Sequence, residues 1–326
     1  MNSGALLNYI YGLVIELAFI FLIPFLLMLI TTPYLIRKLT KRGLVVRDYY
    51  KNGIKMVPTG GGIAIMLAVL FSMSINSMFY KFDATNYVAL NVILLFGLFG
   101  VLDDMIDIGR PVKLVLMYYC SYPLMQYAVH SSVLFPYIGH VDFGIFYSQL
   151  VVPTFVLVAA NLVNMHSGFN GLSSGLSIIV LFSLIIKALI GGPIDNIVAI
   201  IALTGATLGF HLFERYPSRI FWGNVGSLTV GATIGVMIVM QGYIFSGFIM
   251  LLPHTINFLM YVYWRAMKYP QVKFGKVRED GTLEVPNPLT LKWVLPYYKR
   301  VTERQATYAM YAVTIVFCII GILMPG

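Results

Sequence analysis

Residues 17–38 read LAFIFLIPFLLMLITTPYLIRK, an uncharged and mostly apolar stretch that ends at Arg37-Lys38. A helix needs about 20 such residues to cross the hydrocarbon core of a bilayer. Similar stretches recur along the 326-residue chain, in which 59% of the residues are hydrophobic, 11% are charged and the mean hydropathy is +0.83. Soluble domains carry about 25% charged residues. The sequence therefore predicts one integral membrane domain that comprises residues 1–326.

The uncharged stretches predict an all-α, polytopic protein with about ten transmembrane helices. We expect them at 17–36, 57–80, 86–102 and 114–135, at two places within 142–187 on either side of the polar stretch 161–177, at 196–213, at two places within 220–264 with a turn near 241–246, and at 305–325. One sizeable polar insert lies at about 266–304. It is rich in Gly and Pro, which is typical of an ordered loop with little long regular structure.

The distribution of basic residues predicts the orientation of the chain. Ten helices place alternate loops on opposite sides, and the odd-numbered loops hold 20 of the 22 Lys and Arg residues, whereas the other side holds Lys81 and Lys187. Cytoplasmic loops of membrane proteins are enriched in Lys and Arg. We therefore expect both termini outside, five loops in the cytoplasm, and a cell-membrane location.

The same distribution accounts for the formal net charge of +9 without a nucleic-acid partner. Cys120 and Cys318 both lie in apolar stretches, so no disulfide framework and no zinc-ligand spacing is expected. The first sixteen residues contain no Lys or Arg, and a cleavable signal peptide is therefore not expected.

Adjacent carboxylates, Asp103 and Asp104, follow the predicted third helix, and Lys113 begins the next one. Two neighbouring carboxylates at a membrane boundary repel each other, and a divalent cation or a proton-accepting role offsets that cost. The alternative is a pair of solvated loop acids. Lys113 is either a snorkelling anchor or a ligand for a lipid phosphate.

A second polar cluster, residues 161–175, contains three asparagines and lies at the predicted cytoplasmic ends of two helices. Backbone groups at membrane depth must be satisfied internally or line a wet cavity. Amide side chains both donate and accept hydrogen bonds, which suits a pyrophosphate or the edge of a base. The alternative is helix packing by small residues with amide bonds between helices. His166 is expected to line a site at most.

Glycine-containing turns open two further helices on the same side, at Pro58–Gly62 and Phe221–Ser227. Helix N-termini present free N–H groups to phosphate. In the insert, Lys276 and Arg278 are either phosphate ligands or topological charges. Acids, amides, glycine turns and basic residues on one predicted face together favour metal-assisted phosphoryl chemistry on a diphosphate.

These motifs resemble the polyprenyl-phosphate N-acetylhexosamine-1-phosphate transferases, of the glycosyltransferase 4 type, from about Arg37 to Arg304. Residues 164–172, NMHSGFNGL, are more similar to the eukaryotic and archaeal dolichyl-phosphate GlcNAc-1-phosphate transferases than to the bacterial enzymes, which have acids there. The insert also lacks the histidine-rich motif of the MurNAc-pentapeptide transferases.

The resemblance implies transfer of GlcNAc-1-phosphate from UDP-GlcNAc to a dolichyl or polyprenyl phosphate, with release of UMP, as the first step of lipid-linked glycan synthesis of the N-glycan type. It implies Mg²⁺, or Mn²⁺ in its place, and a cytoplasmic active site. It also implies a role for each matching residue. Asp103 and Asp104 are catalytic and bind metal with Asn164 and Asn224, Lys113 binds the lipid phosphate, and the nucleotide sugar contacts Val46, Arg47, Asp48, Thr59, Asn164, Asn170, Phe221, Lys276 and Arg278.

One departure from the family concerns position 224, where Asn224 replaces an aspartate that ligates metal. An amide oxygen binds a hard cation without the carboxylate's charge. Either this branch tolerates weaker Mg²⁺ binding, or the chain is less active, or the position was changed.

Three alternatives stay open at this point. The same reaction with another UDP-N-acetylhexosamine or with undecaprenyl phosphate fits the motifs, and a secondary transporter also has ten helices with intramembrane polar residues. A homodimer is compatible with the sequence, which does not determine the oligomeric state.

Overall fold

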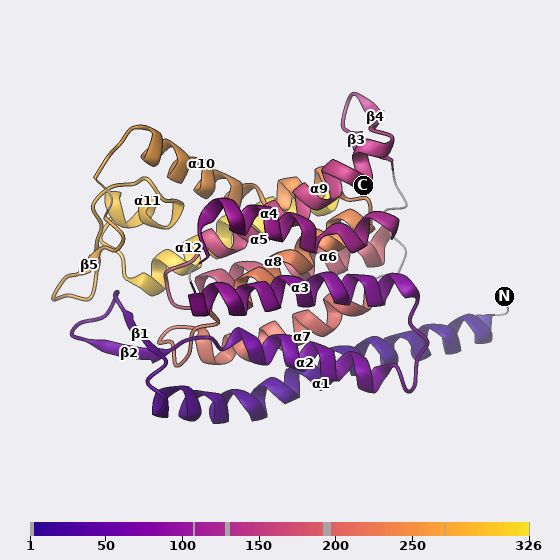
Figure 1. Cartoon of the computed structure of the whole chain (residues 1–326), viewed down its shortest axis with the longest axis horizontal. Coiled ribbons are helices and arrows are strands. Elements are labelled where there is room, and N and C mark those ends of the chain that lie inside the picture. Colours follow the sequence, from indigo (N-terminus) through magenta and orange to yellow (C-terminus); the bar gives the residue numbers. More distant parts are fainter. Residues whose placement is uncertain (1–2, 107, 128–130, 192–196, 271, 326) are drawn as a thin grey trace.

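The computed structural model describes residues 3–106, 108–127, 131–191, 197–270 and 272–325. Its main feature is a bundle of roughly aligned helices (Figure 1). The six helical segments long and apolar enough to cross a membrane belong to α1 (Ser3–Lys41), α3 (Ala84–Ile106), η2 with α5 (Tyr147–Val151 and Val152–Met165), α6 (Leu172–Gly191), α8 (Gly223–Met240) and α12 (Glu303–Leu323).

Besides these six segments, the described residues contain one bent pair of helices and two shorter apolar helices. The helices α9 (Ile244–Met250) and α10 (Leu252–Ala266) meet at a bend of 67° and count together as one candidate span. The helices α2 (Gly62–Asn76) and α7 (Val198–Glu214) are apolar but shorter than the other spans. The described residues thus contain six candidate spans, or seven with the bent pair. The chain is a mostly helical, multi-pass membrane protein, and the expected number of ten spans is not confirmed.

The predicted fourth span, 114–135, is where sequence and structure differ most. The helix α4 (Arg110–Cys120) is short and is followed by the 3-10 helix η1 (Tyr122–Tyr127). Pro123 has no N–H for a helical hydrogen bond and disfavours the helical conformation in the residue before it, so it favours a helix end before Pro123 and suits the first turn of η1. The strand β3 (Ser132–Phe135) then pairs with β4 (Gly139–Asp142). Residues 128–130 of this predicted span, and residue 196 of the seventh, lie outside the described residues.

The structure contains short antiparallel hairpins, which the all-α prediction did not include. Besides β3–β4, the strand β1 (Val45–Asp48) pairs with β2 (Lys55–Pro58), and β5 (Lys276–Val277) pairs with β6 (Leu283–Glu284). The predicted second span therefore begins with a strand, and its helix starts only after the Gly60-Gly61 turn. The insert also contains the helix α11 (Leu291–Tyr298) and packs through Leu283 and Trp293 against Tyr50 and Phe169.

The helix α8 lies at the centre of the bundle, because every residue from Val225 to Met240 is buried. Glycines allow its neighbours to approach closely. A Cβ atom on Gly231 would lie 2.7 Å from Cα of Ala160 in α5, and a Cβ on Gly62 of α2 would lie 2.2 Å from the backbone nitrogen of Gly226. The position of α8 is thus fixed by backbone contacts as well as by side-chain packing.

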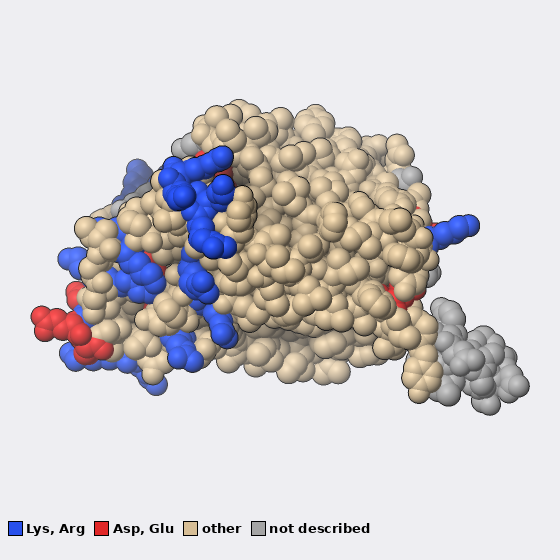
Figure 2. All heavy atoms as spheres, turned by 90° about the horizontal axis from the view of Figure 1, so that it is seen from below, with Lys and Arg blue, Asp and Glu red and all other residues tan. Residues whose placement is uncertain are grey.

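The loops and hairpins collect at the two ends of the bundle. In Figure 1, β1, β2, β5 and α11 lie at one end, whereas both chain termini and β3–β4 lie toward the other. Figure 2 shows that most Lys and Arg side chains of one face gather toward one end, with one at the opposite end, and that a broad surface between the two ends carries no charged residues. An uncharged band of this kind is what a bilayer-spanning surface requires.

The close approach of α8 to α5 predicts a large effect of a small substitution. We expect Gly231→Ala to lower the free energy of unfolding by about 1–3 kcal/mol, because an added methyl group overpacks a backbone contact. Gly12→Ala in α1, where nothing lies within 4 Å of an added Cβ, is the control and should be neutral or slightly stabilising. Thermal unfolding in detergent, followed by tryptophan fluorescence, measures both, and equal melting temperatures would contradict the packing described for α8.

Candidate active site

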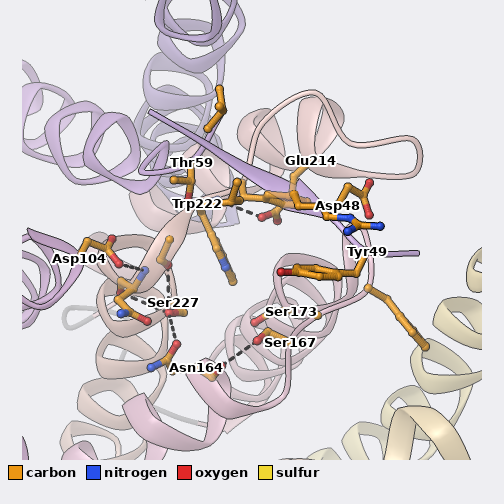
Figure 3. Close-up of a pocket in the computed structure, with 18 of the residues that line it drawn as sticks. Asp48, Tyr49, Thr59, Asp104, Asn164, Ser167, Ser173, Glu214, Trp222 and Ser227 are labelled. Carbon is orange, nitrogen blue, oxygen red and sulfur yellow. Dashed lines mark hydrogen bonds between the residues drawn. The ribbon is translucent and has the colours of Figure 1, made fainter. Parts of the chain in front are cut away.

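A cavity of about 580 Å³ opens at the end of the bundle that carries β1, β2 and the insert. Its lining comes from all five connections that the sequence places on one side (Figure 3). Of the predicted site residues, the lining includes Val46, Arg47, Asp48, Thr59, Asp104, Asn164, Phe221 and Asn224. A cavity of several hundred Å³ has the volume of a small-molecule site.

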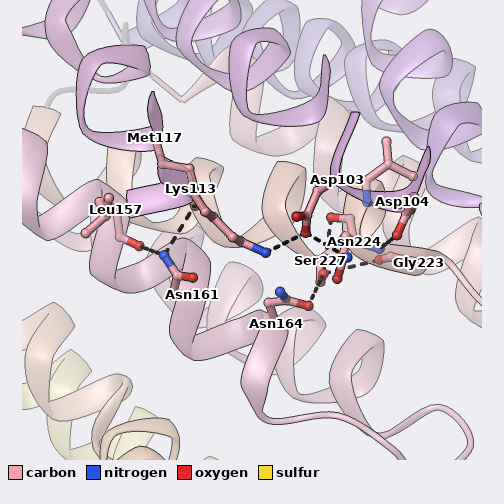
Figure 4. Close-up of polar contacts among 11 residues, drawn as sticks. Asp103, Asp104, Lys113, Met117, Leu157, Asn161, Asn164, Gly223, Asn224 and Ser227 are labelled. Atoms are coloured by element: carbon pink, nitrogen blue, oxygen red, sulfur yellow. Dashed lines mark hydrogen bonds and ion pairs between the residues drawn. The ribbon is translucent and has the colours of Figure 1, made fainter. Parts of the chain in front are cut away.

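The two adjacent acids are held in different ways. Asp103 is buried, and its Oδ2 accepts a hydrogen bond from the Asn224 amide at 2.9 Å and pairs with Lys113 Nζ at 2.5 Å (Figure 4). Asp104 accepts the backbone N–H groups of Asn224 and Val225 at 3.1 and 3.3 Å. These are free amides of the first turn of α8, where a helix favours negative charge. Each carboxylate therefore has its own partner, which offsets the repulsion between them.

A glycine permits the contact between Asp104 and α8. Gly223 has a positive φ of 70°, and a Cβ atom there would lie 2.6 Å from Asp104 Oδ2. The glycine before Asn224 is thus required by both the backbone conformation and the space that the carboxylate occupies.

The asparagines of residues 161–175 have separate positions. Asn164 lines the cavity, and its Oδ1 accepts a hydrogen bond from Ser227 of α8 at 2.9 Å. Asn161 donates to the Leu157 carbonyl one turn earlier, at 2.9 Å. Asn170 is buried and does not line the cavity. Its amide donates to Asp48 at 3.2 Å, and its oxygen accepts the Ser218 N–H at 2.9 Å. Both groups of the Asn170 amide are therefore used within the protein.

The Asn170 amide belongs to a buried charge network behind the cavity. Lys51 pairs with Asp48 at 3.2 Å and with Glu303 at the start of α12, and Glu303 accepts the backbone N–H of Asn170 at 2.6 Å. Asp48 and Glu303 are each only 3% exposed. One ammonium group thus serves two buried carboxylates, and together they join the β1–β2 hairpin, the turn at Asn170 and α12.

The insert contributes basic residues to the site, but not those that the motif indicated. Lys273 and Phe274 line the cavity. Lys276 is exposed on β5, and Arg278 donates to the Leu283 carbonyl at 2.5 Å within the β5–β6 hairpin. Lys273, three residues before Lys276, was not predicted from the sequence, because the motif match in this segment was too loose to select it.

Glu214 at the end of α7 is a second residue that sequence analysis missed. It lines the cavity, is 4% exposed, and accepts the Trp222 N–H at 3.1 Å through Oε1. Its position ten residues before Asn224, outside any recognised motif, gave no signal in the sequence. His166, in contrast, lies behind the cavity against His254, with ring centroids 4.8 Å apart, and its burial lowers the pKa well below the usual value.

A second, apolar groove of about 410 Å³ lies between α4, α5 and α10. Its polar residues are Lys113, Asn161 and Asn164, and the rest of its lining is mostly apolar, including Leu114, Leu157, Val158, Leu162, Met165, Phe258 and Tyr261. Asn164 belongs to the lining of both the groove and the cavity. The apolar groove therefore reaches, through Lys113, the cluster formed by Asp103, Lys113 and Asn224.

The acidic and amide groups fit a magnesium site of one particular kind. The described residues contain no group of three or more His, Cys, Asp or Glu side chains placed to hold a metal ion. Mg²⁺, however, is commonly held by one or two carboxylates together with substrate phosphates and water. Asp103 and Asp104, with the side-chain amides of Asn164 and Asn224 in the same hydrogen-bonded cluster, supply ligands of the type that this arrangement uses.

The chain is thus a multi-pass helical bundle in which a polar cavity lies beside an apolar groove. The chain belongs to glycosyl transferase family 4, whose family model matches residues 86–242. The resemblance seen in the sequence motifs is thereby confirmed, and it argues against the secondary transporter.

Relatives from archaea and bacteria extend this match. The chain is 31% identical over 317 residues to a protein of Saccharolobus solfataricus that carries the provisional name UDP-N-acetylglucosamine–dolichyl-phosphate N-acetylglucosaminephosphotransferase, with 93% of this chain and 95% of the relative covered. A Sulfolobus acidocaldarius protein with the same provisional name is 29% identical over 93% of the chain and 94% of its own length. The phospho-N-acetylmuramoyl-pentapeptide-transferase of Clostridioides difficile is 34% identical, over 67% of the chain and 73% of its own length.

The charge network behind the cavity predicts a strong effect of losing its cation. We expect Lys51→Met to lower the free energy of unfolding by about 3–5 kcal/mol, because two buried carboxylates lose their only ammonium partner in the described network. Adding Glu303→Gln should restore part of that loss, since it removes one unpaired charge. Denaturant titration of the wild type, the two single variants and the double variant measures this, and a double variant as unstable as the sum of the single changes would contradict the network.

The environment of Lys292, which contacts the turn after α5, predicts a pH dependence of stability. Lys292 of α11 donates to the Ser167 carbonyl at 2.5 Å, and burial lowers the pKa of its ammonium group from 10.5 to about 8. Between these two pH values the unfolded chain binds the proton and the folded chain does not, so the stability contributed by this group rises with pH.

We therefore expect wild-type stability, relative to Lys292→Met, to increase from pH 8 to 10.5. The exposed Lys299, on the same insert, provides the control substitution Lys299→Met. A difference between wild type and Lys292→Met that does not change with pH would show that the ammonium group is not buried.

Proposed function

We propose that this protein transfers GlcNAc-1-phosphate from UDP-GlcNAc to a dolichyl-type polyprenyl phosphate and releases UMP, at the cytoplasmic face of the cell membrane. The observation that carries the proposal is the network of Asp103, Lys113 and Asn224, with Asp104 beside it, at the point where a polar cavity and an apolar groove meet. A reaction between a water-soluble and a lipid substrate requires such a meeting point.

The polar cavity suits the nucleotide sugar. Phe221 and Trp222 provide aromatic surface, and Arg47 and Lys273 provide positive charge for a diphosphate. Asp48 is held in place by the half-buried Lys51 and by the buried Asn170. We propose that Asn170 acts indirectly, by orienting Asp48, and that Lys273 takes the phosphate role expected of Lys276 and Arg278.

The apolar groove suits the acceptor lipid. Its mostly apolar walls accommodate a hydrocarbon chain, and Lys113 lies at its polar end. An ammonium group has three N–H donors. One of them is used by Asp103, so the others are available to a lipid phosphate.

The reaction forms a bond between a lipid-phosphate oxygen and the β-phosphorus of the donor, while the bond from that phosphorus to the bridging oxygen breaks and UMP leaves with the bridging oxygen. A phosphomonoester has its second pKa near 6 and is largely dianionic at neutral pH. It is therefore already a nucleophile, and the protein mainly positions two anions that repel each other. We propose direct attack, because the lipid phosphate is already nucleophilic, whereas pairing with Lys113 and hydrogen bonds from two backbone amides lower the nucleophilicity of Asp103 and Asp104.

Asp103 and Asp104, with Asn164 and Asn224, would hold Mg²⁺, which neutralises charge on the diphosphate in this chemistry. The choice of GlcNAc and of a dolichyl acceptor is supported by the relatives that match 93% of the chain, whereas the pentapeptide-transferase match covers 67%.

Transfer of [14C]GlcNAc from UDP-[14C]GlcNAc into the organic phase, with purified protein, Mg²⁺ and dolichyl phosphate, tests the proposed function. We expect label in the lipid with the wild type and a decrease of at least about 100-fold with Asp104→Asn, because a carboxylate that serves the transferring group is lost. Asp142→Asn, which alters an exposed carboxylate on β4, is the matched control.

The Asn224→Asp variant tests, in the same assay, how the uncharged side chain at position 224 affects the Mg²⁺ requirement. A carboxylate would then lie about 2.9 Å from Asp103 Oδ2, a repulsion that a divalent cation relieves. We therefore expect this variant to reach half-maximal rate at a lower Mg²⁺ concentration than the wild type. Label in no lipid product with any UDP-N-acetylhexosamine would contradict the proposed function, and a labelled phospho-enzyme formed from [β-32P]UDP-GlcNAc alone would contradict direct attack.

A further inference from the structure

Four side chains at the mouth of the cavity form a continuous stack. The rings of Tyr49 and Phe274 lie face to face, with centroids 3.7 Å apart and planes 5° from parallel. The Arg47 guanidinium lies 5.2 Å from the Tyr49 centroid, and Lys273 Nζ lies 5.6 Å from the Phe274 centroid. All four residues line the cavity, and Figure 3 shows Tyr49 at its edge.

The stack joins two segments that are far apart in the sequence. Arg47 and Tyr49 lie at the end of β1, whereas Lys273 and Phe274 lie in the insert just before β5. The neighbouring Tyr50 packs against Phe274 and so supports the contact between Tyr49 and Phe274. Its ring meets Phe274 at 6.4 Å in an edge-to-face arrangement, and its hydroxyl oxygen accepts the Trp293 indole N–H at 3.1 Å.

Packing alone does not explain the face-to-face geometry. Aromatic pairs prefer offset or edge-to-face arrangements, and Tyr49 remains 40% exposed. Cations over the two outer faces stabilise such a stack through the negative faces of the rings. Among the described residues, neither Arg47 nor Lys273 forms an ion pair with a carboxylate, so both charges remain available.

We propose that Tyr49 and Phe274 are positioning residues for the donor substrate: their stack is a strap across the cavity mouth that holds Arg47 and Lys273 where they bind the diphosphate of the nucleotide sugar. This inference rests on the function proposed above. Hydrogen bonds from a cation to phosphate are stronger than exposed cation–π contacts. The diphosphate thus binds the N–H donors of both cations, which stay over their rings.

The geometry also determines what the strap does not bind. Ring centroids 3.7 Å apart leave no space for a base between them, and the outer faces are covered by the cations. The strap thus recognises phosphate through its cations, and the nucleoside is bound elsewhere in the cavity.

Two pairs of variants of the full-length protein separate the stack from the aromatic residues as such. Tyr49→Leu and Phe274→Leu each remove one aromatic ring of the stack, whereas Tyr49→Phe and Phe274→Tyr keep both rings. Tyr298→Leu, which alters an exposed tyrosine of the same insert, is the matched control. Binding of UDP-GlcNAc, UDP and uridine is measured by isothermal titration calorimetry, and KM for donor and for dolichyl phosphate by the transfer assay.

We expect each leucine variant to bind UDP and UDP-GlcNAc about tenfold more weakly, because loss of either ring removes the stack that positions both cations, with uridine binding and the KM for dolichyl phosphate unchanged. The double leucine variant should bind no more weakly than either single variant, since one stack is lost in each case. The ring-preserving variants and Tyr298→Leu should bind like the wild type.

Other outcomes would contradict the proposed role of the strap. Equal weakening of uridine and UDP binding would show that the rings contact the nucleoside, and unchanged UDP binding in leucine variants with wild-type melting temperatures would show that they position nothing. If the ring-preserving variants lose binding as the leucine variants do, stacking is not the cause. A wild-type protein that binds no uridine nucleotide and transfers no sugar phosphate refutes the proposed function itself, whereas a wild type that does both, with leucine variants that match it, refutes only the strap.

Discussion

The carboxylate of Asp104 accepts the first free N–H groups of α8, and this contact joins the end of α3 to the start of the most buried helix of the bundle. The rest of the site follows from it. With α8 in place, Asn224 reaches Asp103, Ser227 reaches Asn164, and Lys113 completes the cluster from α4. The neutral amide at position 224 matters here, because it donates a hydrogen bond to Asp103 where an aspartate would repel it.

Much of the helical architecture was predictable, since uncharged stretches of sufficient length leave a chain few alternatives in a bilayer. The segment 114–135 shows the limit of that argument. It contains no Lys, Arg, Asp or Glu, yet the α-helix ends at Cys120, shortly before Pro123, and Ser132–Phe135 pairs as a strand. Hydropathy measures how well a segment suits lipid, whereas hydrogen bonding decides whether it is one helix.

The site was predictable where its residues belong to short motifs and unpredictable where loops fold back over them. Asp104, Asn164 and Asn224 lie in motifs next to helix ends, so their convergence followed from the order of the helices. Asn170 belongs to the same kind of motif but faces away, into contact with Asp48 and Ser218. Lys273 lines the cavity in place of Lys276 because Tyr50, Trp293 and Phe274 pack the insert in a register that no local pattern reveals.

Following the phosphorus atom itself tests the central claim most directly, namely that the cluster between cavity and groove transfers a sugar phosphate to a lipid. Purified protein is incubated with [β-32P]UDP-GlcNAc, dolichyl phosphate and Mg²⁺, and the products are separated by organic extraction. The account predicts that the label enters the lipid while unlabelled UMP is released. Label that remains in the aqueous phase as UDP, with the sugar alone on the lipid, would contradict it.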